Sequence, residues 1–178
     1  GSALAALIAK VVLQPELTIP FDIIRGYELP HYVNRHTLVI ASSYSGNTEE
    51  TLATLEQAEK CGAQLAILAS GGMLIDHAGS FDIAHVTLPG GMQPRMATIS
   101  SLRGLFALLA NFGVISAQWG EDLEHLSSWL RQETDTWLPE IPTAENYAKQ
   151  IALETEGKIP VFYGTPLTAP LAYKYKIS

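Results

Sequence analysis

Three short apolar runs, each followed by a segment with a helical pattern, restrict the fold of this chain more than any other feature. A strand that is apolar at almost every position is typical of a parallel sheet covered on both faces, because neither face of such a strand meets water. The runs are Leu38–Ala41, Gln64–Ala69 and Ile83–Leu88, and the helical segments after them are Thr48–Lys60, Met73–Ala78 and Met96–Val114. This alternation predicts an α/β fold, with a doubly wound, mostly parallel sheet flanked by helices.

The segments outside this alternation predict how the chain divides into domains. Apolar spacing predicts further helices over Ala3–Leu13, Asp122–Thr134 and Thr143–Glu156, with Thr143 as the N-cap of the last, and strands over Thr18–Arg25 and Ile159–Tyr163. The last of these strands is interpreted as the first of another α/β unit. We therefore predict a first domain over residues 1–140, and a linker helix with the truncated start of a second domain over residues 141–178.

Small hydroxyl residues fill the turn between the first buried strand and its helix, and we call residues 43–48 the hydroxyl loop. The side chains of Ser43, Ser45 and Thr48 can each donate an O–H to an anion, and Gly46 lacks the Cβ that would keep the backbone away from a bound group. The N-terminus of the helix that follows is positive. The loop therefore suits a small phosphate ester held by neutral donors.

The same turn also has a purely structural interpretation. Asn47 or Thr48 would be an ordinary helix N-cap, and Glu50, three residues after Asn47, would complete a capping box. Glu49 and Glu50 at the first turn of a helix are stabilised by its dipole, which gives them a structural reason to be there instead of a role as catalytic base. Spacing alone leaves phosphate binding and capping as open alternatives.

A second informative stretch is Pro89–Arg95, which we call the arginine loop. Its two glycines and two prolines predict a loop of fixed shape that presents one guanidinium just before the helix over Met96–Val114. Ligands of doubly wound sheets lie beyond the carboxyl ends of the strands, which is where Ser43 and Ser70 are expected. Arg95 either pairs with a surface carboxylate or faces the same crevice as Ser43, where it would bind phosphate or stabilise an oxyanion.

Charge and composition exclude several classes of function. A formal net charge of −7 with 11 Lys and Arg argues against nucleic acid as a partner, because neutralising a phosphate backbone needs clustered positive charge. The single Cys61 excludes an intramolecular disulfide and is compatible with the cytoplasm. The 5 His lack metal-ligand spacing, so no metal is expected. Apolar runs stay well short of the ~18 residues of a membrane span, so no membrane association is expected.

The two loops together resemble those of sugar isomerase (SIS) domains, and most closely those of the bifunctional phosphoglucose/phosphomannose isomerases. The hydroxyl loop continues as Ser-Tyr-Ser-Gly-Asn-Thr-Glu-Glu-Thr, and Gly-Gly-Met-Gln-Pro-Arg follows in the arginine loop. Further similar stretches are Phe21–Pro30, Ser70–Gly72, Val161–Gly164 and Ala172–Lys176, so that the resemblance covers nearly the whole chain. It implies the SIS fold, which these proteins carry twice.

The resemblance also implies which residues bind the substrate. Ser43, Ser45 and Thr48 match the phosphate-binding loop of the family, with Gly46 in its backbone. Ser2 matches a phosphate-binding serine in an opening Gly-Gly-Ser turn, to which Gly1 would contribute backbone. The ligand would be a hexose 6-phosphate, bound without cofactor, and a cytoplasmic homodimer is expected.

The reaction that the resemblance implies is aldose–ketose isomerisation. Arg95 matches the catalytic arginine that stabilises a cis-enediolate as glucose 6-phosphate or mannose 6-phosphate interconverts with fructose 6-phosphate. A glutamate base and a ring-opening histidine are expected beyond Ser178, in a longer protein, so this chain lacks the matched base. The alternatives are a non-catalytic sugar-phosphate sensor and another SIS isomerase of arabinose or glucosamine phosphate. The Gln-Pro-Arg stretch counts against the last.

Overall fold

A three-stranded parallel sheet forms the centre of the molecule in the computed structural model, which describes residues 3–177. The strands are β1 (Leu38–Ser42), β2 (Gln64–Ala69) and β3 (Ala84–Thr87), in the order β1-β2-β3. In register, Leu38 pairs with Gln64 and Ala66 pairs with Ala84. The strands predicted from the three apolar runs are thus confirmed, and so is the α/β class.

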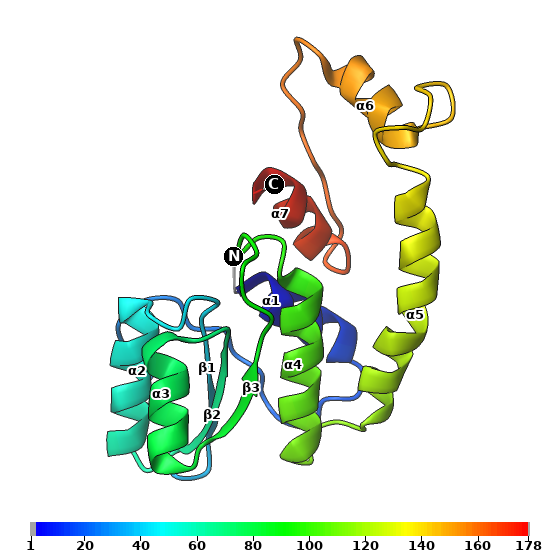
Figure 1. Cartoon of the computed structure of the whole chain (residues 1–178). Helices are drawn as coiled ribbons and strands as arrows, with labels where there is room; N and C mark the ends of the chain where they lie inside the picture. The colour runs from blue at the N-terminus through cyan, green and yellow to red at the C-terminus, as the bar shows by residue number, and fades with distance from the viewer. Residues whose placement is uncertain (1–2, 178) are drawn as a thin grey trace.

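Helices cover both faces of this sheet (Figure 1). The helices α2 (Glu49–Lys60) and α3 (Gly72–Phe81) lie on one face, while α1 (Ala3–Leu13) and α4 (Thr98–Asn111) pack together on the other. Each connection between neighbouring strands contains one of these helices, as parallel pairing requires. The result is a three-layer arrangement with a separate apolar core on each side of the sheet.

The central strand shows why its sequence is apolar from Leu65 onward. Side chains alternate between the two faces of a strand, and Ala66 and Leu68 enter the core formed with α1 and α4. Ile67 and Ala69 enter the other core, with Leu55 of α2 and Leu74 of α3. All four β2 side chains are almost fully buried, at 0–1% exposure. The absence of a polar face follows from this double burial.

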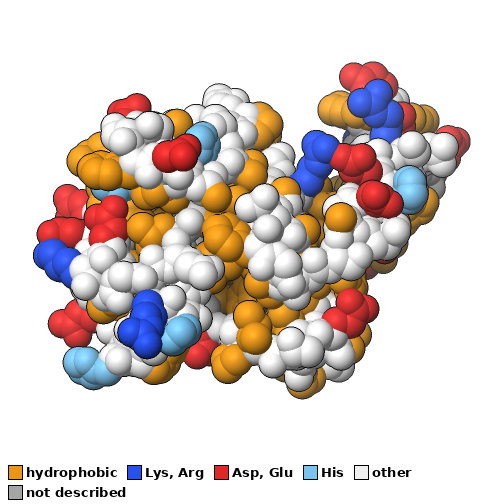
Figure 2. Space-filling model, turned by 90° about the horizontal axis from the view of Figure 1, so that it is seen from below, with side chains coloured by type: hydrophobic (Ala, Val, Ile, Leu, Met, Phe, Trp, Pro, Cys, Tyr) orange, Lys and Arg blue, Asp and Glu red, His pale blue; other side chains and the backbone are white. Residues whose placement is uncertain are grey.

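The C-terminal part of the chain forms an arm that extends away from the three layers and returns to α1 (Figure 1). It consists of α5 (Gln118–Asp135), α6 (Tyr147–Thr155), an extended segment and α7 (Ala169–Ile177), which contacts α1. α5 buries none of its residues, and Leu126 and Trp129 are half exposed. Figure 2 shows hydrophobic side chains at the surface, among separate small groups of positive and negative side chains.

Two predicted strands and one predicted cap are wrong. Thr18–Arg25 and Ile159–Tyr163 have no strand pairing, because the sheet over residues 3–177 consists of β1, β2 and β3, and neither segment lies in it. Asn146, and not Thr143, is the N-cap of α6, where its side chain accepts a hydrogen bond from the Lys149 N–H. The division into domains at residue 140 stays a prediction.

Candidate functional site

The loops that follow the three strands lie together at one edge of the sheet. Because the strands are parallel, their carboxyl ends meet at this edge, which is the usual place for a ligand in such folds. The hydroxyl loop follows β1, Ser70 and Gly71 join β2 to α3, and the arginine loop follows β3. The topology therefore brings the predicted binding segments to one end of the sheet, on the side of α7 (Figure 1).

Within the hydroxyl loop, the side chains of Ser43 and Thr48 contact each other. Their hydroxyl oxygens are 2.6 Å apart, and Ser43 is only 2% exposed. Thr48 is the N-cap residue of α2 by position, but its side chain makes no capping hydrogen bond. Of the two residues considered for the N-cap, Thr48 holds the position, while its hydroxyl lies with Ser43 at the positive end of α2. The capping box of Asn47 with Glu50 is not formed, because Asn47 is not the N-cap residue. Ser45 is exposed, and its hydroxyl accepts a bond from the Asn47 N–H at 3.3 Å.

Asn47 connects the hydroxyl loop to the next helix instead of capping its own. Its side-chain oxygen accepts a hydrogen bond of 2.9 Å from the backbone N–H of Met73, at the start of α3. The Gly46 carbonyl accepts another from the Leu74 N–H at 3.1 Å. Gly46 has a φ of +71°, and a Cβ there would lie 1.8 Å from the Gly71 oxygen. The two loops approach so closely that only glycine fits.

Tyr44 joins all three loops. Its carbonyl oxygen accepts hydrogen bonds from the Ser70 N–H at 2.9 Å and from the Ser70 hydroxyl at 2.6 Å. Its phenolic O–H donates to the Pro89 carbonyl at 2.8 Å and accepts from the Met92 N–H at 3.0 Å. The hydroxyl loop and the arginine loop are therefore connected through the side chain of one residue.

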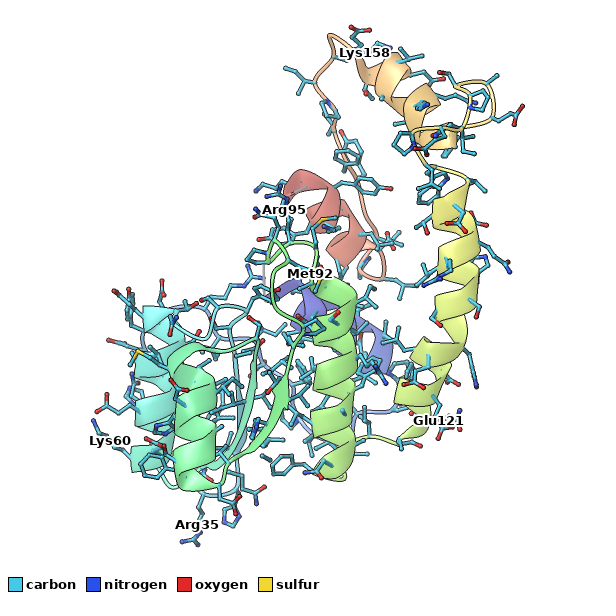
Figure 3. The ribbon with its side chains drawn as sticks, in the orientation of Figure 1. Arg35, Lys60, Met92, Arg95, Glu121 and Lys158 are labelled. Atoms are coloured by element: carbon cyan, nitrogen blue, oxygen red, sulfur yellow. The ribbon has the colours of Figure 1, made fainter. Side chains whose placement is uncertain are left out.

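Arg95 is exposed in the arginine loop, beside α7 (Figure 3). Its carbonyl oxygen accepts a hydrogen bond of 2.8 Å from the Lys174 Nζ of α7. The structure thus places Arg95 on the same edge of the sheet as Ser43. That its guanidinium faces Ser43 in one crevice stays a prediction, and Gly1 and Ser2 lie outside the described residues.

The two carboxylates next to the hydroxyl loop interact with a tyrosine. Tyr27 donates its O–H to the Glu49 carboxylate at 3.5 Å. The negative charge of Glu50 raises the pKa of the Tyr27 hydroxyl, with smaller contributions from burial and from Glu49. Both glutamates lie in the first turn of α2, as the sequence predicts.

Sequence reasoning placed Ser70 at this edge together with Ser43, since both follow a buried strand, but it assigned no role to two other residues that shape the edge. Tyr44 gave no signal beyond its place in the motif, and Lys174 is 79 residues away from the arginine that it contacts. Over residues 3–177, no cluster of His, Cys, Asp and Glu is suited to hold a metal, and no helix is long and apolar enough to cross a membrane.

Comparison with known proteins places these motifs in context, although no family model matches the chain. A bifunctional phosphoglucose/phosphomannose isomerase of Caldicellulosiruptor bescii is 36% identical over 177 residues, covering 99% of this chain and 52% of that protein. A protein of the same name from Aquifex aeolicus is 34% identical over 157 residues, covering 88% of this chain and 45% of the relative.

A relative with a different name is similar over the same extent. The D-glucosamine-6-phosphate 4-epimerase of Sulfolobus acidocaldarius is 30% identical over 177 residues, which cover 99% of this chain and 52% of that protein. The chain spans about half the length of the curated relatives that it matches. Along nearly all of its own length, it is a homologue of the bifunctional phosphoglucose/phosphomannose isomerases of the SIS family, and the resemblance indicated by its motifs is confirmed.

Proposed function

We propose that the protein carrying this chain is an aldose–ketose isomerase of hexose 6-phosphates. It interconverts glucose 6-phosphate, mannose 6-phosphate or both with fructose 6-phosphate through a cis-enediol or enediolate. The observation that carries this proposal is the joining of the hydroxyl loop to the arginine loop by the two hydrogen bonds of the Tyr44 hydroxyl. A phosphate-binding loop is thereby tied to a loop with a single guanidinium.

Each loop has a separate task in this reaction. The hydroxyls of Ser43, Ser45 and Thr48 and the positive end of α2 bind the substrate phosphate. Binding of this remote group orients the open-chain sugar, so that its free energy is used to lower the barrier at C1 and C2. Arg95 stabilises the negative charge that develops on the enediolate oxygen. The proton-transfer groups are expected from the resemblance to lie beyond Ser178.

A second candidate is the epimerisation of an amino-sugar phosphate. The relative named D-glucosamine-6-phosphate 4-epimerase aligns over the same 99% of this chain as the first isomerase. A phosphate-binding loop serves either reaction, because it holds a part of the substrate that does not react.

Two further expectations also remain proposals. One is the division at residue 140 into a first SIS domain and the start of a second. The other is the homodimer, which sedimentation velocity tests.

Turnover measurements on the protein that carries this chain test the proposed function. Fructose 6-phosphate is supplied, and coupled assays follow the formation of glucose 6-phosphate and mannose 6-phosphate; D-glucosamine 6-phosphate is assayed separately. Arg95→Ala is expected to lower kcat/KM by about 10²- to 10³-fold, because it removes stabilisation of the developing charge. Arg35→Ala is the matched control, since Arg35 is an exposed arginine at the opposite end of the sheet from Arg95 (Figure 3).

The outcomes separate the alternatives. Formation of either hexose phosphate, lost in Arg95→Ala and kept in Arg35→Ala, supports the isomerase. Turnover of D-glucosamine 6-phosphate alone indicates the epimerase. Binding of fructose 6-phosphate without any turnover would leave a sugar-phosphate sensor and refute the enzyme.

A further inference from the structure

We propose that Tyr44 is a positioning residue, whose hydroxyl holds the arginine loop in the shape that the reaction requires. The inference rests on the proposed function, and it assigns Tyr44 no contact with the substrate. Its basis is two hydrogen bonds between one phenol and the backbone of the arginine loop: the phenol donates to the Pro89 carbonyl and accepts from the Met92 N–H.

Tyr44 is itself firmly held. It is 8% exposed, and its ring lies in the apolar core with Leu88, Ala97 and Leu102. Its backbone is fixed from the other side by the two hydrogen bonds that its carbonyl accepts from Ser70. A buried ring anchored at its backbone leaves the hydroxyl little freedom, so it provides a rigid attachment point for the loop.

The two prolines of the arginine loop restrict the backbone near its ends, whereas the two glycines at its centre gain most from an added attachment. Gly90 and Gly91 separate Pro89 from Met92, and glycine loses more backbone entropy on ordering than any other residue. The phenol bonds one backbone group on each side of this pair. Ordering the glycines is thus coupled to a side chain of the hydroxyl loop.

The position of Met92 is transmitted to Arg95 over a short distance along the chain. Directly after Met92, the Gln93 carbonyl accepts a hydrogen bond of 2.8 Å from the Met96 N–H, which closes a turn over Pro94 and Arg95. Lys174 holds the other end of the loop through the Arg95 carbonyl. With both ends fixed, the Cα of Arg95 has a defined place relative to the phosphate-binding hydroxyls. In well-oriented sites, a misplacement of about 1 Å lowers the reaction rate by about 10²-fold.

The test uses Tyr44→Phe, Arg95→Ala and the double variant, assayed with fructose 6-phosphate. Removing only the hydroxyl keeps the ring in the core. We expect kcat to fall about 10- to 100-fold with KM changed less than about 3-fold, because the phosphate-binding hydroxyls stay in place. In the Arg95→Ala background the same change is expected to cost less than about 2-fold, since Tyr44 acts through Arg95. Tyr32→Phe is the matched control, because its hydroxyl donates to Asp22, a residue of neither loop.

A second measurement does not depend on turnover. Hydrogen–deuterium exchange over residues 89–96 is expected to be faster in Tyr44→Phe than in the unchanged protein, and unchanged in Tyr32→Phe. If Tyr44→Phe does not fold, Lys174→Met releases the other end of the same loop and is expected to show the same loss of kcat and the same non-additivity with Arg95→Ala.

The results distinguish failure of this inference from failure of the proposed function. An unchanged protein without turnover refutes the proposed function, while unaltered exchange at residues 89–96 in Tyr44→Phe refutes the tether. The positioning role is overturned if the protein is active and Tyr44→Phe keeps the full kcat. It is also overturned if Tyr44→Phe lowers activity by the same factor in the Arg95→Ala background as in the unchanged protein.

Discussion

Replacing Gly46 by Ala should separate the hydroxyl loop from the start of α3. The new Cβ would lie 1.8 Å from the Gly71 oxygen, and real Cβ contacts under 3.0 Å essentially never occur, so the two backbones must move apart by about 1.2 Å. That movement stretches the bond from the Leu74 N–H to the Gly46 carbonyl and the bond from the Met73 N–H to Asn47.

The expected cost follows from these contributions. An L-residue in the left-handed region costs about 1 to 2 kcal/mol, and each of the two hydrogen bonds is worth about 1 kcal/mol. Gly46→Ala should therefore lower the free energy of unfolding by about 3 to 4 kcal/mol. Gly62, which ends α2, has a similar φ of +67° and nothing within 4 Å of its Cβ position. Gly62→Ala should cost only the conformational part, about 1 to 2 kcal/mol.

Urea unfolding followed by circular dichroism measures the series. Gly79→Ala completes it, because Gly79 lies exposed in α3 with open space around its Cβ position and should gain up to about 1 kcal/mol from helix propensity. The reasoning fails if Gly46→Ala costs no more than Gly62→Ala, since the close approach of the two loops would then have no energetic consequence.

Three further predictions concern the core, a cap and a titrating group. Gly104→Ala should cost about 1 to 3 kcal/mol in urea unfolding, because its Cβ would lie 2.6 Å from a buried leucine of β2; a stability equal to that of the unchanged protein would refute this overpacking. Asn146→Ala should weaken α6 by about 1 kcal/mol, seen as faster amide exchange there, whereas Thr143→Ala should not, and equal effects would contradict the observed cap. The hydrogen bond from Tyr32 is the main cause that holds the pKa of Asp22 below its usual value. Ionised Asp22 therefore stabilises the fold at a pH above its unfolded pKa, and this stability is lost as the pH falls through its folded pKa. Tyr32→Phe should raise the pKa of Asp22 in an NMR titration, and an unchanged titration would refute that assignment.

Much of the sheet could be predicted because its signals are local. Gln64–Ala69 is predicted and observed with the same ends, and the helix over Ala3–Leu13 ends at the predicted residue. A run of apolar residues must leave water whatever its neighbours are, and a helix forms its hydrogen bonds within its own segment. The predictions of strands at Thr18–Arg25 and Ile159–Tyr163 were wrong because a strand forms its hydrogen bonds with another strand. β-Propensity within one segment does not supply that partner.

The parallel α/β sheet and the position of the hydroxyl and arginine loops at its edge can be predicted from chain order and apolar spacing. The contacts of the loop side chains depend on how the three loops pack in the folded protein. The Thr48 hydroxyl meets Ser43 instead of capping α2, and Asn47 bonds the start of α3. Tyr44 and Lys174 hold the arginine loop from different elements. Short polar side chains have several partners of similar energy within reach, and only the packing of the three loops against one another selects among them.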